Sequence, residues 1–279
     1  MSKRIQLILT TIIFLGSIHT FAQKQCCSPT QQFASLGSAE DFRAEHQLPK
    51  TATVKTKSGN WIEFSTADER NGRGYLVKAT KPGNRYLFIF HEWWGLNENT
   101  MNEVERWAIE LPGVNVIALD LYDGKVATTR EAASEIMQAA DELRIRSIIE
   151  GATEWAGSKA EIATLGWCFG GGWSMQAALQ LDNQAVGCVL YYGMPESDTT
   201  FLKGLNCKVL GIFAENDKWI NRKVVGAYEQ SMNALKKPYD TYWYKADHAF
   251  ANPSNSVFNE AAAEDAFQKT RQFLHQAFK

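Results

Sequence analysis

This chain of 279 residues lacks a marked excess of charge of either sign. Its 29 basic and 31 acidic side chains leave a formal net charge of −2. Such a balance favours neither a nucleic-acid partner nor an acidic interaction tail. Proline is also scarce, with seven residues, and no repeat, low-complexity tract or Pro- and Ser-rich linker divides the chain. We therefore expect one large folded domain.

Long hydrophobic runs are scarce as well, with one exception at the N-terminus. Two basic residues precede the almost unbroken apolar run Ile5–Ile18, and Thr20 and Ala22 are small residues of the kind that signal peptidase reads. This pattern predicts a secretory signal peptide over residues 1–22, cleaved after Ala22. The alternative is an uncleaved anchor, for which the run is short. We expect an exported protein, periplasmic in a Gram-negative source, without stable membrane insertion after cleavage.

The five cysteines matter in an oxidising compartment. Cys26 and Cys27 are adjacent, so they form a strained ring when oxidised and are too few to hold a metal alone. A redox or metal role and a plain leader segment (residues 23–50) both stay open for them. Cys188 and Cys207 lie in strand-like apolar patterns, which is typical of core thiols. Cys168 must be shielded to remain a free thiol.

The apolar pattern after residue 50 predicts an α/β fold. Alternating segments separated by Ser58-Gly59-Asn60 and Asn71-Gly72 predict antiparallel hairpin strands, expected at residues 53–56, 61–65 and 75–79. Continuous apolar runs then alternate with helical periodicity, as a parallel sheet buried on both faces requires. These strands are expected at 86–90, 114–118, 162–165, 186–191, 209–213 and 239–244, and the helices at 98–111, 131–155, 173–181, 222–235 and 258–278. Residues 51–279 are predicted to form a single domain with a doubly wound, mostly parallel sheet and an antiparallel N-terminal hairpin.

One strand-to-helix junction carries the strongest functional indication. The apolar run Ile162–Leu165 leads into Gly166-Trp167-Cys168-Phe169-Gly170, and a helical stretch follows. Gly-x-Cys-x-Gly in this context is the nucleophile-elbow pattern, with sulfur in place of the usual serine oxygen. The glycines leave room for a turn so tight that the nucleophile is strained, and the helix N-terminus favours a thiolate. The alternative is a non-catalytic turn around a buried cysteine.

A thiol nucleophile needs a base and a carboxylate that orients the base. The chain order with this elbow is nucleophile, acid, histidine, each after a strand. Asp217 follows the strand expected at 209–213, and His248 follows the last strand. Asp247 and Glu215 are the rival acids, and His91 is the rival histidine. The histidines set aside, because they lie in the signal peptide, the leader and the terminal helix, are His19, His46 and His275.

The segment His91-Glu92-Trp93-Trp94-Gly95 closes the first central strand. It begins like a His-Glu-x-x-His zinc motif, but its fifth residue is glycine and it is not helical, which argues against zinc. In hydrolases with this elbow, the loop after this strand and the residue after the nucleophile each supply one oxyanion-hole amide. The expected donors are the amides of Trp93 and Phe169. Glu92 is either an acid that holds the thiol proton or a buried, paired carboxylate.

With these residues in place, the chain resembles the dienelactone hydrolase family from about Thr51 to the C-terminus. The motifs that carry the resemblance are His91-Glu-Trp-Trp-Gly, Asp120-Leu-Tyr-Asp-Gly, Gly166-Trp-Cys-Phe-Gly-Gly, Tyr191-Tyr-Gly, the Asp217 loop and His248-Ala-Phe. The resemblance implies an α/β-hydrolase fold. It also implies Cys168 as nucleophile, Asp217 and His248 as its partners, and Glu92 as the acid that governs thiol ionisation. It further implies hydrolysis of small lactones and activated esters without metal or organic cofactor.

The chain departs from the family where a substrate carboxylate would be held. Members that act on dienelactone clamp it with arginines, one of them four residues after the catalytic histidine, where this chain has Asn252. Arg130 is a loosely aligned candidate for another. Loss of a forked donor weakens recognition of an anionic substrate. The chemistry is therefore carried over, but not the dienelactone substrate.

The sequence thus predicts an exported cysteine-dependent hydrolase of small esters or lactones with a thioester intermediate. We expect a monomer with a small apolar pocket, whose candidate lining residues are Trp94, Tyr122, Arg130, Trp167, Tyr192, Phe250 and Asn252. The aromatic residues among them are equally compatible with plain core. Two alternatives stay open. One is a hydrolase-shaped binding protein whose elbow no longer turns over; the other is a thiol redox component using Cys26 and Cys27.

Overall fold

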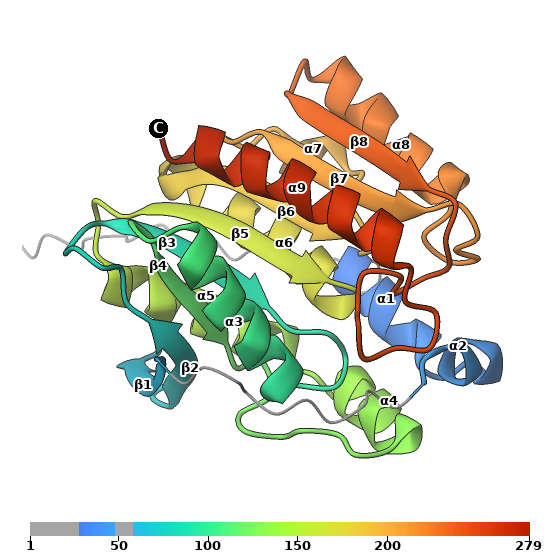
Figure 1. Cartoon of the computed structure of the whole chain (residues 1–279), viewed down its shortest axis with the longest axis horizontal. Helices are drawn as coiled ribbons and strands as arrows, with labels where there is room; N and C mark the ends of the chain where they lie inside the picture. The colour runs from blue at the N-terminus through green and yellow to red at the C-terminus, as the bar shows by residue number, and fades with distance from the viewer. Residues whose placement is uncertain (1–27, 48–57) are drawn as a thin grey trace, which may run out of the picture.

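The computed structural model describes residues 28–47 and 58–279, and this part contains an eight-stranded sheet (Figure 1). The strand order is β1-β2-β4-β3-β5-β6-β7-β8. β1 pairs antiparallel with β2, and β2 antiparallel with β4, whereas the remaining neighbours are parallel. The predicted α/β class and its antiparallel hairpin are confirmed. The predicted signal peptide, Cys26, Cys27 and the strand expected at 53–56 lie outside the described residues.

The elements have the following bounds. The strands are β1 (Asn60–Ser65), β2 (Asn71–Val77), β3 (Arg85–Phe90), β4 (Asn115–Leu119), β5 (Glu161–Trp167), β6 (Ala185–Tyr191), β7 (Val209–Ala214) and β8 (Tyr239–Tyr244). The helices are α1 (Pro29–Leu36), α2 (Glu40–Glu45), α3 (Glu98–Glu110), α4 (Arg130–Gln138), α5 (Glu142–Ala156), α6 (Phe169–Gln180), α7 (Thr199–Leu202), α8 (Arg222–Ala234) and α9 (Glu260–Ala277), with a short 3₁₀ turn, η1 (Asp182–Gln184).

Helices cover both faces of the sheet. α3 and α9 lie on one face, and α5 and α6 on the other (Figure 1). At the centre, α6 packs against β3, β5 and β6. The central parallel strands are therefore buried on both sides, as their continuous apolar runs predicted. Within the described residues, no helix is long and apolar enough to span a bilayer.

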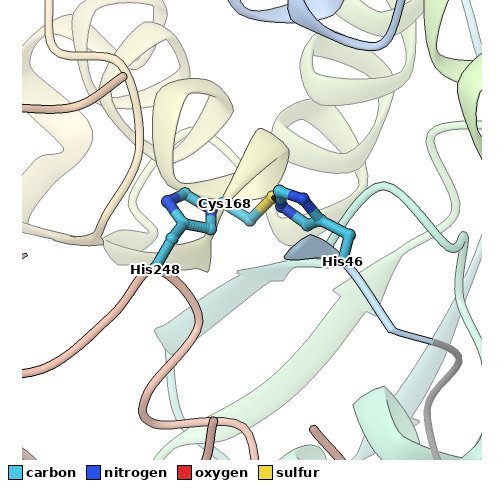
Figure 2. Close-up of side chains that lie close together, drawn as sticks. All are labelled: His46, Cys168 and His248. Carbon is cyan, nitrogen blue, oxygen red and sulfur yellow. Dashed lines mark hydrogen bonds between the residues drawn. The ribbon is translucent and has the colours of Figure 1, made fainter. Parts of the chain in front are cut away.

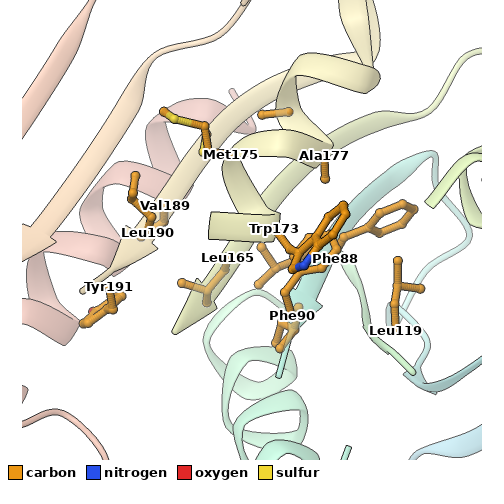
Figure 3. Close-up of a cluster of buried hydrophobic side chains, with 14 of the residues drawn as sticks. Phe88, Phe90, Leu119, Leu165, Trp173, Met175, Ala177, Val189, Leu190 and Tyr191 are labelled. Carbon is orange, nitrogen blue, oxygen red and sulfur yellow. The ribbon is translucent and has the colours of Figure 1, made fainter. Parts of the chain in front are cut away.

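The core beneath α6 fixes the position of the elbow (Figure 3). Phe88, Leu165 and Val189, from three neighbouring strands, are fully buried, Phe88 on the face that α6 covers and the other two on the opposite face. Trp173 of α6, 1% exposed, belongs to the same cluster. Burial of each such side chain contributes about 1.5–3 kcal/mol. α6 is thereby held firmly on the sheet, and so is Cys168, the residue immediately before it.

The single helix expected over residues 131–155 is two helices, α4 and α5, so this prediction was wrong. Asp141 begins α5, because its side chain accepts a hydrogen bond from the Leu143 amide at 2.9 Å. Thr129 begins α4 in the same way, accepting from the Ala132 amide at 3.1 Å. Such side-chain caps compete with a continuous helix. The cap residues determine the break between α4 and α5, which the apolar periodicity does not indicate.

The pair Asn71-Gly72 was expected to separate two strands, but both residues lie inside β2. Gly72 is paired with Phe64 of β1. A Cβ on Gly72 would lie 2.3 Å from that ring, so glycine makes room for the aromatic side chain rather than for a turn. The chain reverses at residues 66–70 instead. Arg144, 4% exposed, stabilises this reversal from α5 by donating to the Asn71 carbonyl at 2.8 Å.

The described part of the leader, residues 28–47, lies beyond the carboxyl ends of the central strands (Figure 1). α1 packs against α4 and α6, and α2 packs against α4. Phe33 and Phe42 are 1% and 0% exposed, so the segment shares the core of the domain. Arg130 at the start of α4 donates to two backbone carbonyls near the end of α2, at 3.4 Å each. The leader therefore lies over the edge where the predicted site residues converge.

Candidate active site

The turn from β5 into α6 places Cys168 at the carboxyl edge of the sheet. Its φ of 56° and ψ of −122° are angles that side-chain-bearing residues rarely adopt. A Cβ on Gly166 would lie 2.0 Å from the Gly170 carbonyl oxygen, and one on Gly170 would lie 2.2 Å from the Phe90 carbonyl oxygen. The two glycines therefore permit the crowded turn that the elbow pattern predicts.

Asp217 and His248 form a buried hydrogen-bonded pair. His248 Nδ1 donates to Asp217 Oδ2 at 2.5 Å. Asp217 Oδ1 accepts from the amides of Trp219 and Ile220, at 2.9 Å each. Burial alone would lower the pKa of His248, but the Asp217 carboxylate outweighs it and raises this pKa well above the usual range. The pair holds the ring in one orientation, with Nε2 directed away from the carboxylate.

The rival acids and the rival histidine are engaged elsewhere. Asp247 accepts a hydrogen bond from Asn216 at 2.9 Å, and Glu215 pairs with Arg222 at 3.0 Å. His91 Nδ1 donates to the Glu92 carbonyl at 2.6 Å, and its Nε2 accepts from the Leu121 amide at 3.2 Å. Both ring nitrogens of His91 are used, so this residue joins two loops and offers no lone pair to a metal or substrate.

The sulfur of Cys168 lies between two imidazoles (Figure 2). Its Sγ is 3.8 Å from Nε2 of His46, and Sγ and the closest ring nitrogens of His46 and His248 all lie within 4.8 Å of one another. His46 Nδ1 donates to the Phe42 carbonyl at 2.6 Å. Burial, together with the neighbouring His248, lowers the pKa of His46 to about 3. His46 is therefore neutral and presents the lone pair of Nε2 to the thiol.

The sequence interpretation set His46 aside as a leader residue, and the structure corrects this. His46 directly follows α2 and is 3% exposed. One feature of the sequence could have drawn attention to His46: it lies four residues after Phe42, a spacing that places both residues on one face of a helix. The sequence carried no sign that this face meets Cys168, 122 positions away.

Aromatic side chains of the leader cover the thiol. The Phe42 ring packs edge-on against Trp93 and Trp219, with centroid distances of 5.5 and 4.9 Å. Phe33 stacks on the His248 ring at 6.3 Å. Cys168 is consequently 1% exposed, which is the shielding expected for a persistent free thiol.

Glu92 extends the network on the side of the last loop. Asn252 Nδ2 donates to Glu92 Oε2 at 2.8 Å, so the residue found in place of the expected arginine binds this carboxylate. Burial raises the pKa of Glu92 to about 7, although the Asn252 hydrogen bond and His248 oppose the shift. Burial also raises the pKa of Cys168; His248 opposes this rise and Glu92 adds to it. The carboxyl group thus bears on thiol ionisation through its charge.

The two backbone amides expected as oxyanion donors belong to Trp93 and Phe169. Phe169 is the first residue of α6, where an amide has no acceptor within the helix. Its N–H lowers the pKa of the Cys168 thiol, so it is directed at the sulfur. The Trp93 amide has no backbone acceptor among residues 28–47 and 58–279. Both amides come shortly after the carboxyl ends of β3 and β5, which are adjacent strands.

The residues predicted to line a pocket separate into three places. Trp94, Trp167 and Asn252 line a cavity of 290 Å³ beside Glu92. The aromatic residues around Cys168 and His248 are core instead: Tyr192 lies 5.0 Å from the His248 ring, Phe250 lies 5.7 Å from Tyr192, and Tyr122 lies 5.5 Å from Phe169. Arg130 binds α2 and does not line this cavity.

Comparison with known proteins agrees with the motifs. The profile of the Dienelactone hydrolase family matches residues 73–278. Protein usf of Aquifex pyrophilus is 27% identical over 236 residues, which cover 77% of this chain and 97% of the relative. A putative carboxymethylenebutenolidase of Aquifex aeolicus is 26% identical over 180 residues, covering 60% of this chain and 75% of the relative.

The fold is likewise shared with solved structures. A putative dienelactone hydrolase from Klebsiella pneumoniae matches with a TM-score of 0.68 at 21% identity, covering 79% of this chain and all of that one (100%). At this identity the likeness concerns the fold. The segment matched by the family profile begins in β2, so the leader with His46 lies outside it.

Proposed function

Because the chain belongs to the dienelactone hydrolase family and is a hydrolase of that type, we propose that it is exported and cleaves small esters or lactones with Cys168 as its nucleophile. The observation that carries the proposal is the strained elbow cysteine beside the buried pair His248–Asp217. A nucleophile, a base and a carboxylate that orients the base are the parts that acyl transfer needs.

The chemistry divides into acylation and hydrolysis. His248 Nε2 takes the thiol proton, and the sulfur attacks the substrate carbonyl carbon. The alkoxide leaving group departs with the proton from His248, which leaves an acyl thioester on Cys168. A water molecule, deprotonated by His248, then attacks the thioester; the acid is released and the thiol regains its proton.

The amides of Trp93 and Phe169 stabilise the negative charge of both tetrahedral intermediates. Such preorganised donors are worth about 3–4 kcal/mol each when they face the oxyanion. Glu92 acts on the same step through its charge, because a carboxylate near the sulfur opposes thiolate formation, whereas a protonated carboxyl does not.

We propose that the substrate is held in the cavity beside Glu92, whose lining residues do not include Cys168 or His248. Aromatic residues such as Trp94, Trp167 and Tyr191 supply apolar walls, and Asn252 is one of its polar groups. Its volume of 290 Å³ suits a small acyl or lactone group. Arg106 also lines this cavity, but its guanidinium already lies 3.8 Å from Glu103 and 3.9 Å from Glu264. Asn252 lacks the charge and the fork of an arginine, so we propose neutral esters and lactones rather than a dienelactone carboxylate.

The test is turnover of p-nitrophenyl acetate and of small neutral lactones by the wild type, Cys168→Ala and Cys188→Ala. Cys188 is also fully buried, so it controls for loss of a core thiol. We expect Cys168→Ala to lose at least about 10³-fold in kcat/KM and Cys188→Ala to retain activity. Equal rates in wild type and Cys168→Ala would refute the proposal.

A second candidate, a hydrolase-shaped binding protein, is favoured by one observation, the nearly complete burial of Cys168. The two candidates differ in the fate of the acyl group. Intact-mass measurement after mixing with p-nitrophenyl acetate distinguishes them. A persistent acyl adduct on Cys168 without a second turnover supports the binding protein, whereas a transient adduct with continued turnover supports the hydrolase.

Export is proposed from the basic and apolar N-terminal pattern of residues 1–22. The measurement is N-terminal sequencing of the protein isolated from its native host. We expect Gln23 as the first residue. An intact N-terminus in the cytoplasmic fraction would contradict this part of the proposal.

A further inference from the structure

Three buried side chains from distant parts of the chain converge on one point. His46 comes from the leader, Cys168 from the elbow and His248 from the loop after β8 (Figure 2). Their ligand atoms lie within 4.8 Å of one another, and the Sγ–Nε2 distance to His46 is 3.8 Å. A tetrahedral zinc ion with bonds of about 2.0–2.3 Å needs neighbouring ligand atoms roughly 3.5 Å apart. The Cys168–His46 pair is close to this spacing at 3.8 Å, whereas a pair at the full 4.8 Å must close by about 1.3 Å.

Each imidazole is already oriented as a metal ligand would be. A ligating histidine usually donates its other ring N–H to a carboxylate or a carbonyl, which fixes the tautomer. His248 donates through Nδ1 to Asp217 at 2.5 Å, and His46 donates through Nδ1 to the Phe42 carbonyl at 2.6 Å. In both residues Nε2 is therefore the atom left to bind a ligand.

The polar groups of this cluster do not satisfy one another. The Cys168 thiol has a single proton to donate, and two ring nitrogens lie close to it. Its sulfur faces His46, while Nε2 of His248 has no hydrogen-bond partner in the described part of the chain. His248 is 4% exposed, so this nitrogen is deprived of bulk water as well. A buried polar atom without a partner costs about 1–3 kcal/mol, and a bound cation removes that cost.

We propose that His46, Cys168 and His248 bind a Zn²⁺ ion, with the fourth position left to water or a small anion. Thiolate and imidazole are ligands that suit this ion. Binding replaces the S–H bond by an S–Zn bond and an N–H bond at Nε2 of His248 by an N–Zn bond, and both protons pass to solvent without a change of oxidation state. Because sulfur and Nε2 of His248 are then both occupied, the zinc form and the nucleophilic form exclude each other. His46 also ties the leader to the metal.

The experiment measures metal binding, so its result is separate from that of the hydrolase assays. The protein is the chain from residue 23 with Cys26→Ser and Cys27→Ser, so that these two thiols do not compete for the ion. Zn²⁺ is titrated by calorimetry, and Co²⁺ is used as an absorbing substitute. We expect one ion per chain and a thiolate-to-cobalt charge-transfer band.

The variants are graded by their place in the site. His46→Gln should weaken Zn²⁺ binding more than the about 10–100-fold expected for Asp217→Asn, which removes only the partner of a ligand. His275→Gln, an exposed histidine in α9, should leave affinity unchanged. Cys168→Ser should abolish the charge-transfer band. This readout tests the metal site by itself if His46→Gln fails to fold. Affinity unaltered in His46→Gln, or a band that survives in Cys168→Ser, would overturn the proposal.

Discussion

Replacing Phe42 with alanine tests whether the leader controls access to the thiol. Phe42 is fully buried, and its ring contacts Trp93 and Trp219 above the site. Truncation of a buried phenylalanine costs about 3–5 kcal/mol. The ring lies between the leader and the rest of the protein. The lost packing energy therefore destabilises the position in which the leader covers Cys168, and not the sheet.

The magnitude follows from a two-state opening. If Cys168 reacts only when the leader is displaced, its alkylation rate is proportional to the fraction of open molecules. Each 1.4 kcal/mol changes that fraction about tenfold, so the lower estimate of about 3 kcal/mol predicts a rise of roughly 100-fold. The rise saturates once the open form predominates.

The assay is iodoacetamide labelling under native conditions, with Cys168 followed by peptide mass spectrometry. Phe201→Ala is the matched control, because Phe201 is 52% exposed and lies in α7. We expect no change in labelling for this control. A Phe42→Ala protein that keeps its melting behaviour and shows wild-type labelling would refute the reasoning, since the leader would then not be the barrier.

Three further perturbations test other parts of the structure. Glu105 accepts hydrogen bonds from Tyr75 at 2.7 Å and from the backbone amides of the segment before β1. Glu105→Gln replaces one accepting oxygen by an NH₂ group that faces these donors, so it should lower the free energy of unfolding by about 2–3 kcal/mol. An unchanged midpoint of urea unfolding would contradict this. Burial raises the pKa of Glu92 from 4.5 to about 7, so the folded state binds this proton more tightly than the unfolded state. That stabilisation is complete below pH 4.5 and is lost as the pH rises to about 7. Urea unfolding should show the wild type losing up to about 3 kcal/mol relative to Glu92→Gln across this window, and parallel pH profiles would dismiss the assignment. Gly170→Ala should prevent folding of the elbow, because its Cβ would lie 2.2 Å from a carbonyl oxygen. Gly226→Ala in α8 is the control, because its Cβ would meet nothing within 4 Å. It should raise the free energy of unfolding by about 0.5–1 kcal/mol in the same assay.

The sequence was sufficient to predict features that depend on residues close together in the chain or on general rules of strand arrangement. The elbow at Cys168 was predictable because glycine spacing, a preceding apolar run and a following helix are all contiguous in sequence. The convergence of Asp217 and His248 was predictable because the carboxyl ends of parallel strands meet at one edge. Their hydrogen bond at 2.5 Å is consistent with that reasoning.

Features that depend on distant packing were not predictable in the same way. The reversal before β2 is stabilised by Arg144 from α5, so the turn chemistry of Asn71-Gly72 pointed to the wrong position. The break before α5 has a different cause, because the Asp141 cap is local and the apolar periodicity masked it. Only the first of the two errors came from a contact between distant residues.

The sequence by itself determined the fold class, the strained cysteine turn and the order of its partners, because these depend on periodicity and on residues close in the chain. Only the tertiary structure decided that His46 faces the sulfur and that the leader covers it. The sequence of a polar segment does not indicate which surface of the protein it will pack against. Its place is fixed where Phe33 stacks on His248 and Phe42 packs against Trp219, beyond the carboxyl ends of the strands.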